Sequence, residues 1–135
     1  MGRLVTLFAN TSYNDILLYN PLTMYSSQLL KGTYQTLILK LLQDHPRMYG
    51  YEISQHLKEH SNGEIQLPEG SLYPILHKMA EEKLVKMERV QIGRRVRRYY
   101  SLTTAGVAEA TSKIDEFNRF MNTMQLLLTP KLKPL

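Results

Sequence analysis

The sequence predicts a mainly α-helical fold with a small β-hairpin wing: a winged helix-turn-helix followed by a C-terminal dimerisation helix. Three observations support this prediction. Two short helical patterns follow one another after Met48, and the second opens at Gly70. Two strand-like runs joined by Gly93-Arg94-Arg95 come next. The last helical pattern then repeats its apolar residues at alternating steps of three and four, which is typical of a coiled-coil seam.

Four segments divide the 135 residues. Residues 1–23 form an irregular N-terminal extension that ends at the turn-forming pair Asn20-Pro21. Because Met24 directly precedes the first patterned helix, we expect either that translation begins there or that residues 1–23 form an arm, loose or ordered against a partner. The remaining segments are a winged helix-turn-helix DNA-binding domain (24–102), a C-terminal dimerisation helix (103–129) and a tail (130–135).

The DNA-binding segment should contain three helices. The first is expected to run from Ser27 to the stop at Asp44-His45-Pro46. The second opens at Tyr49-Gly50-Tyr51 and fades at Ser61-Asn62-Gly63. The third should span Glu69 to Lys83 and bury one apolar stripe, formed by Leu72, Ile75, Leu76 and Met79, while it exposes Ser71, Pro74, His77 and Lys78.

The hairpin carries the most concentrated charge in the chain. Its strands are expected at Leu84–Gln91 and Val96–Leu102, with a glycine-marked turn between them. Four guanidiniums stand at and just after the tip: Arg94, Arg95, Arg97 and Arg98. Each stays charged and can fork two hydrogen bonds onto a phosphate, which favours nucleic acid as the partner. The alternative is a solvated face that protects an edge strand.

The last helix begins at Thr103-Thr104 and has a heptad seam. A narrow apolar stripe that extends beyond the core of a small domain most often packs against the same helix of a second chain, so we expect a homodimer. An ordinary intramolecular helix is the alternative. The predicted dimer interface consists of the seam residues Val107, Ala110, Ile114, Phe117, Met121, Met124 and Leu128.

Charge and composition restrict the function classes. The net charge is +5, and residues 24–102 hold twelve Lys and Arg against eight Asp and Glu, so the basic excess coincides with the winged-helix segment. This favours an anionic partner. The absence of cysteine excludes disulfide frameworks and thiol catalysis and favours a reducing cytoplasm. No apolar run is long enough to span a bilayer, and no signal peptide is recognisable, so no membrane role is expected.

Catalytic and cofactor motifs are not recognisable in the sequence. It contains neither a glycine-rich phosphate loop nor a nucleophile motif, so we expect no enzyme and no cofactor. His56 and His60 have the i, i+4 spacing of metal ligands, but no third ligand accompanies them at an obvious position. No metal site is therefore predicted, and a histidine-based metal-sensing regulator is kept as an alternative.

Four motifs, in the same order along residues 29–106, resemble the PadR-like family of bacterial transcriptional regulators. They are Leu29-Leu30-Lys31-Gly32, Tyr49-Gly50-Tyr51-Glu52-Ile53, Gly70-Ser71-Leu72-Tyr73-Pro74-Ile75-Leu76, and Arg98-Tyr99-Tyr100-Ser101-Leu102-Thr103-Thr104-Ala105-Gly106. The heptad helix that follows resembles the short dimerisation helix of the smaller members. The resemblance implies a dimeric repressor on a roughly palindromic operator which, in some members, is released by a small aromatic or drug-like compound.

Two departures from the family pattern are informative. The chain has no tryptophan, whereas the multidrug-binding members stack flat ligands on tryptophans at the dimer centre. Here Phe117 and Phe120, together with Met121, are the residues expected to line a cleft for a small hydrophobic effector. The second departure is Lys83, which stands before the first wing strand where the family often has glycine.

Individual DNA contacts follow from position and resemblance together. Tyr73 lies at the edge of the third helix's buried stripe, and the resemblance favours a DNA contact for its hydroxyl. Glu69 is expected to complement the helix dipole rather than a base. Of Tyr49 and Tyr51 one should be core, and of Tyr99 and Tyr100 one must face inward. The predicted DNA-binding residues are Tyr49, Tyr51, Ser71, Tyr73, Lys78, Arg94, Arg95, Arg97 and Arg98.

The sequence thus indicates a sequence-specific regulator that binds double-stranded DNA as a homodimer and represses from a palindromic promoter site. Two copies of the third helix would enter successive major grooves about one turn, ~34 Å, apart. The alternative from another class is a protein-interaction module whose arginines only solubilise it. Salt dependence separates the two, because neutralised phosphates make binding weaken steeply with salt.

Overall fold

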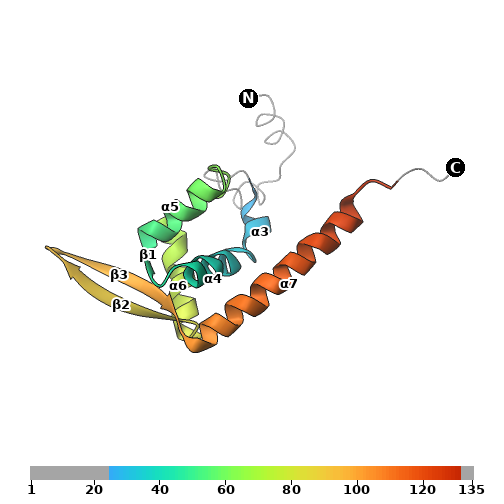
Figure 1. Ribbon diagram of the computed structural model, residues 1–135. Helices are drawn as coiled ribbons and strands as arrows, with labels where there is room; N and C mark the ends of the chain where they lie inside the picture. The colour runs from blue at the N-terminus through green and yellow to red at the C-terminus, as the bar shows by residue number, and fades with distance from the viewer. Residues whose placement is uncertain (1–24, 132–135) are drawn as a thin grey trace, which may run out of the picture.

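The computed structural model describes residues 25–131. Within them, four helices precede a hairpin and one long helix follows it (Figure 1). The residue ranges expected for the N-terminal extension, for a start at Met24 and for most of the tail lie outside the described part. The elements are α3 (Ser27–Leu30), α4 (Tyr34–Asp44), β1 (Met48–Tyr49), α5 (Gly50–His60), α6 (Glu69–Glu81), β2 (Val85–Ile92), β3 (Arg95–Leu102) and α7 (Thr104–Leu128).

The first predicted helix is divided in two. A single helix from Ser27 to Asp44 was expected, but α3 ends at Leu30 and α4 begins only at Tyr34. Thr33 explains the break, since both its backbone N–H and its hydroxyl donate to the carbonyl of Leu30, at 2.9 and 2.7 Å. A hydroxyl that offers such a local hydrogen bond competes with helix continuation.

The core lies where α4, α5 and α6 meet the base of the sheet. The predicted stripe of α6 is confirmed: Leu72, Leu76 and Met79 are fully buried and Ile75 packs beside them. The side predicted to be exposed is exposed as well. Ile38 and Leu39 of α4 and Ile53 of α5 complete the centre, and burial of six such side chains is the dominant stabilising contribution.

The sheet has three antiparallel strands in the order β1-β3-β2. Strand β1 pairs Met48 with Tyr100 and Tyr49 with Tyr99, so a two-residue strand before α5 ties that helix to the wing. Tyr100 is buried and Tyr99 faces outward, which confirms the alternation expected for this pair. The expectation that Tyr49 or Tyr51 belongs to the core is wrong: Met48 occupies that position, because alternation along β1 turns the neighbouring Tyr49 outward.

The wing joins α7 through a tight backbone contact. The Thr103 hydroxyl caps α7 by accepting from Gly106 N–H at 3.0 Å and donates to the Lys83 carbonyl. Thr103 N–H donates to the carbonyl of Leu84 at 3.0 Å. A Cβ at Gly106 would lie only 1.9 Å from that carbonyl oxygen, so this position requires glycine. The base of the wing and the start of α7 therefore form one rigid joint.

The heptad seam is split between two environments. Ala110 was expected at a dimer interface but is fully buried in the chain's own core, and Ile114 packs against that core beside α4. Gln43 of α4 donates to the Thr111 hydroxyl on the same side. The first half of α7 is thus intramolecular at these seam positions, because α4 already covers them. Beyond it the helix extends away from the domain (Figure 1).

Among the described residues, none of the helices combines the length and the apolar character needed to cross a membrane.

Candidate nucleic-acid interface

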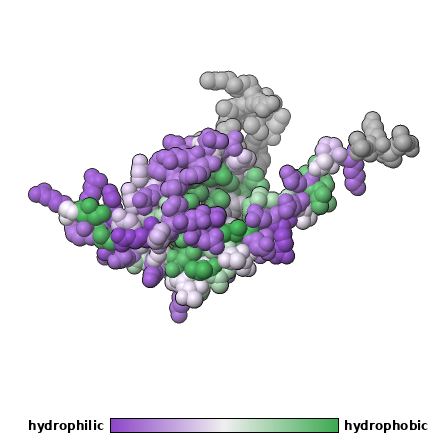
Figure 2. All heavy atoms as spheres, viewed as in Figure 1, coloured by the Kyte–Doolittle hydropathy of each residue, from purple (hydrophilic) through white to green (hydrophobic). Residues whose placement is uncertain are grey.

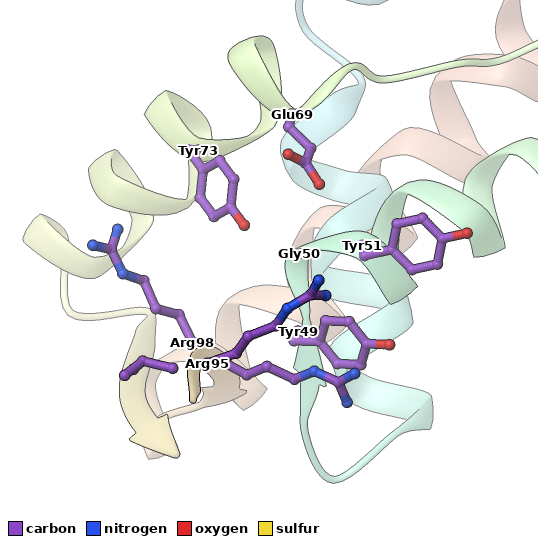
Figure 3. Close-up of a pocket in the computed structure, with 9 residues that line it drawn as sticks. Tyr49, Gly50, Tyr51, Glu69, Tyr73, Arg95 and Arg98 are labelled. Carbon is purple, nitrogen blue, oxygen red and sulfur yellow. The ribbon is translucent and has the colours of Figure 1, made fainter. Parts of the chain in front are cut away.

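An open groove of about 690 Å³ lies between the N-terminal ends of α5 and α6 and the outer part of strand β3 (Figure 3). Three separate segments meet there, and side chains from all three point into one space. The lining residues are Tyr49, Gly50, Tyr51, Glu69, Tyr73, Arg95, Val96, Arg97 and Arg98.

The start of α5 forms one wall. Tyr49 precedes the helix in an extended conformation, and its backbone N–H donates to the Glu52 carboxylate at 3.0 Å. This hydrogen bond holds the helix entry, since the first N–H groups of a helix lack partners of their own. Tyr51 is 54% exposed and its ring stacks at 6.3 Å from that of Tyr49. The two rings give this wall a continuous aromatic surface.

Helix α6 forms the second wall and contacts α5 closely. The Tyr73 ring lies over Gly50, and a Cβ at Gly50 would come within 2.8 Å of the Tyr73 hydroxyl oxygen. Only glycine therefore lets the ring lie across the helix start. Tyr73 remains 36% exposed, so its hydroxyl has access to the groove (Figure 3). Glu69, the first residue of α6, projects into the same space.

Strand β3 forms the third wall. Because β1 pairs only with Tyr99 and Tyr100, no strand within residues 25–131 covers the β3 edge from Arg95 to Arg98 on the side away from β2. The open edge faces the groove. Side chains alternate along the strand, so Arg95 and Arg97 project from one face and Arg98 from the other. The groove therefore collects cations from both faces of the wing.

Two arginines are oriented by aromatic rings. The Arg97 guanidinium lies 4.4 Å from the centre of the Tyr49 ring, and that of Arg47 lies 4.4 Å from the Tyr99 ring. The two tyrosine rings meet edge to face at 5.5 Å. A hydrogen bond with Tyr99 raises the pKa of Arg97 above its ordinary value. Such cation–π contacts position a guanidinium without neutralising it.

A family model and several solved structures name the same family. Residues 38–112 match the family model described as transcriptional regulator PadR-like family, which is more than half of the chain. The chain belongs to the PadR-like family of transcriptional regulators. Members of this family are regulators rather than enzymes.

Solved structures extend the likeness to the fold. The chain is 30% identical to a PadR-like transcriptional regulator from Bacillus cereus, covering 78% of this chain and all of that one, with a TM-score of 0.66. A transcriptional regulator from Clostridium thermocellum is similar in fold, with a TM-score of 0.70 at 23% identity, over 76% of this chain and 100% of that one. A Lysinibacillus sphaericus protein described as uncharacterized is 27% identical over 108 residues, which are 78% of this chain and 96% of that protein.

The groove of this PadR-like chain contains most of the residues predicted to bind DNA. Tyr49, Tyr51, Tyr73, Arg95, Arg97 and Arg98 line it. Ser71, Lys78 and Arg94 do not: Ser71 and Lys78 are exposed on α6, where Lys78 approaches Glu82 at 3.9 Å, and Arg94 is exposed in the hairpin turn. A DNA-binding surface that includes these three residues would have to extend beyond the groove.

Some residues of the site are missing from the sequence-based prediction. Gly50 and Val96 line the groove. Arg47 lies outside the groove, and its guanidinium packs over the Tyr99 ring. Glycine in the family motif Tyr49-Gly50-Tyr51 is a signal that a close contact is needed, although the sequence does not reveal the contacting residue. The Arg47–Tyr99 contact depends on the pairing of β1 with β3, and two residues are too few for a strand pattern.

The metal-sensing alternative depends on His56 and His60. Their rings stack at 5.1 Å, and His45 meets His56 edge to face at 4.8 Å. The Nδ1 atoms of His60 and His45 are each within hydrogen-bond distance of a backbone carbonyl. Within residues 25–131, however, no group of three or more His, Cys, Asp or Glu side chains is arranged to hold a metal ion. The alternative gains no support from this arrangement.

Proposed function

We propose that this PadR-like chain is a sequence-specific DNA-binding repressor that acts in the cytoplasm as a homodimer on a palindromic promoter site. The observation that carries the proposal is the groove, in which the start of α6 and the arginine-rich edge of β3 face the same space. A helix of this kind reads base edges in the major groove with its N-terminal residues, while the wing contacts flanking backbone or minor groove.

The charge of the groove fits a phosphate backbone. Arg95, Arg97 and Arg98 all line it, and the second turn of α6 adds the Tyr73 hydroxyl as a donor. An arginine guanidinium can donate two parallel hydrogen bonds to two oxygens of one phosphate. The solvated-edge alternative does not account for the convergence of these cations on a helix start, since edge protection requires only that charges lie along the strand.

The homodimer is supported by the second half of α7. Past Ile114 the seam positions Met121 and Leu128 are exposed, and Leu128 has 78% of its surface accessible. The neighbours Leu126 and Leu127 are exposed as well. Figure 2 shows a hydrophobic patch near the far end of this helix. An extended helix with an apolar end is unfavourable in water, and a second copy would cover it symmetrically.

Release by a small hydrophobic compound is the remaining part of the proposal. The Phe117 and Phe120 rings lie 6.3 Å apart on α7, and Met121 follows them. Phe117 also lines a cavity of about 170 Å³ shared with the start of α4. A compound that binds beside these rings would alter how two copies of α7 pack. The two reading helices would then no longer keep their one-turn spacing, and DNA affinity would fall.

Fluorescence anisotropy of labelled duplexes from the protein's own promoter, with scrambled duplexes as the control, tests this function. We expect nanomolar binding to a promoter duplex, a preference of at least ~1,000-fold over scrambled DNA, and a stoichiometry of two chains per duplex. Equal and weak binding to both duplexes would contradict it. The protein-interaction alternative would then be favoured, since it needs no preference among DNA sequences.

A further inference from the structure

Glu69 is the only carboxylate that lines the groove among the described residues. It is the first residue of α6 and is exposed to solvent. Opposite it stand the arginines of β3, so a single anion faces a cationic wall (Figure 3). A surface built only to attract phosphate would gain nothing from this carboxylate, because like charges repel.

The Glu69 side chain is not engaged inside the protein. Throughout residues 25–131, no hydrogen bond or ion pair involves its carboxylate. Other exposed carboxylates do have partners: Glu81 pairs with His77 at 3.2 Å and Glu88 with Arg47 at 3.3 Å. The Glu69 oxygens are therefore available to a ligand in the groove. Its only internal role is a favourable interaction with the dipole of α6.

The next residue leaves room for close approach. Nothing lies within 4 Å of the position that a Cβ at Gly70 would take, so the helix start presents bare backbone beside Glu69. Pro68 precedes them and supplies no side-chain cap. The end of α6 that would meet DNA is thus narrow, and Glu69 is its foremost long side chain.

Hydrogen-bond chemistry limits what an ionised carboxylate can bind in DNA. It only accepts, so phosphate oxygens and the acceptor atoms of guanine are excluded as partners. The major-groove donors are the amino groups of cytosine (N4) and adenine (N6), and carboxylate side chains pair characteristically with cytosine N4. The surrounding arginines would hold the duplex backbone close enough for this contact despite the negative charge.

We propose that Glu69 is a specificity-determining residue that accepts a hydrogen bond from a cytosine amino group in each half-site of the operator. This rests on the proposed function and deepens it, because it assigns one base pair to one side chain. Replacing that cytosine with guanine or thymine would leave the carboxylate facing an acceptor or a methyl group, and binding would weaken by about 5-fold or more.

Selection of binding sites from a random duplex library, with wild type and three variants, tests the proposal. Glu69→Gln removes the charge and adds a donor. Glu69→Asp keeps the charge at the helix start but withdraws the oxygens by one methylene. Glu81→Gln, on the same helix and outside the groove, is the matched control for loss of one negative charge. Circular dichroism melts confirm that each variant folds.

Base reading predicts that both Glu69 variants lose the requirement for cytosine at one position per half-site, whereas Glu81→Gln selects the wild-type motif. A dipole role alone predicts that Glu69→Asp behaves as wild type and that Glu69→Gln selects an unchanged motif with affinity altered uniformly. That result would overturn the proposal and leave the proposed function intact. Failure of the wild type itself to select any motif would instead overturn the proposed function, and this assignment with it.

Discussion

Tyr73 lies across Gly50 so closely that a Cβ at Gly50 would sit 2.8 Å from the tyrosine hydroxyl oxygen and 3.1 Å from Cζ. This contact joins the first residue of α5 to the first turns of α6. It fixes the angle between the two helices where they border the groove, and it positions a donor there. Both residues belong to family motifs, and the structure shows why the motifs depend on one another.

Gly50→Ala should impair DNA binding without unfolding the protein. Alanine favours the helix by roughly 0.5–1 kcal/mol over glycine, which offsets part of the strain created when the rigid Tyr73 ring is displaced. We expect stability within ~1 kcal/mol of wild type and affinity for the selected duplex reduced about 10-fold or more. Gly32→Ala is the control, because nothing lies within 4 Å of a Cβ there. Wild-type affinity in Gly50→Ala would show that Tyr73 has no role in the interface.

Gly106→Ala should destabilise the whole domain. Its Cβ would overlap the backbone carbonyl of Leu84, and backbone at a joint held by Thr103 cannot move aside freely. A decrease of at least ~2 kcal/mol in the free energy of unfolding is expected from urea titration. The helical control Gly70→Ala has open space and should gain up to ~1 kcal/mol. Equal stabilities for the two variants would mean that the joint is loose.

Lys83→Gly should stabilise the protein. Lys83 has φ of 61°, the left-handed conformation, which disfavours residues with a Cβ by about 1–2 kcal/mol. Glycine avoids that strain but loses more chain entropy on folding, so a net gain of roughly 0.5–1 kcal/mol remains. Thermal unfolding measures it, with Lys86→Gly in strand β2 as a control that should destabilise. A lower melting temperature for Lys83→Gly than for wild type would refute this account of the turn.

Charges on the exposed seam of α7 should separate the dimer into folded monomers. We expect Met121→Asp combined with Leu128→Asp to shift the mass in sedimentation equilibrium from two chains to one, while the circular dichroism spectrum stays helical. Ser112→Asp combined with Thr123→Asp adds the same two charges on the opposite face of the helix, where both side chains are exposed, and should remain dimeric. A wild-type protein that is monomeric at micromolar concentration would contradict the homodimer directly.

The predictions from sequence succeeded where the pattern was local and repeated. The apolar stripe of α6 and the alternation of Tyr99 and Tyr100 follow from helical and strand periods, and the structure reproduces both. The glycine turn at Gly93 has φ of 60°, as a hairpin marked by glycine requires. The candidate site was also largely predictable, because the arginines that line the groove are close together in the sequence.

What the sequence did not reveal depends on contacts between distant segments. The two residues of β1 are too short to form a pattern, yet their pairing with β3 places Tyr49 beneath Arg97. The heptad seam does not indicate which part is covered by α4, so Ala110 was assigned to the wrong surface. Position within a periodic stripe predicts that a residue is covered, but only the tertiary structure shows by which surface.

The salt dependence of promoter binding, measured with Arg94, Arg95, Arg97 and Arg98 all changed to Ala, tests whether the wing binds the DNA backbone. The control removes four cations outside the groove: Lys40, Lys58, Arg119 and Lys131. The logarithm of the binding constant falls linearly with the logarithm of the salt concentration, and each DNA phosphate that the protein no longer neutralises should make this slope shallower by about 0.9. The slope of the wing variant should therefore be shallower than that of wild type by roughly 2 to 4, and the slope of the control variant by much less. Equal slopes for the two variants would show that net charge, and not the position of these arginines on the wing, attracts the DNA.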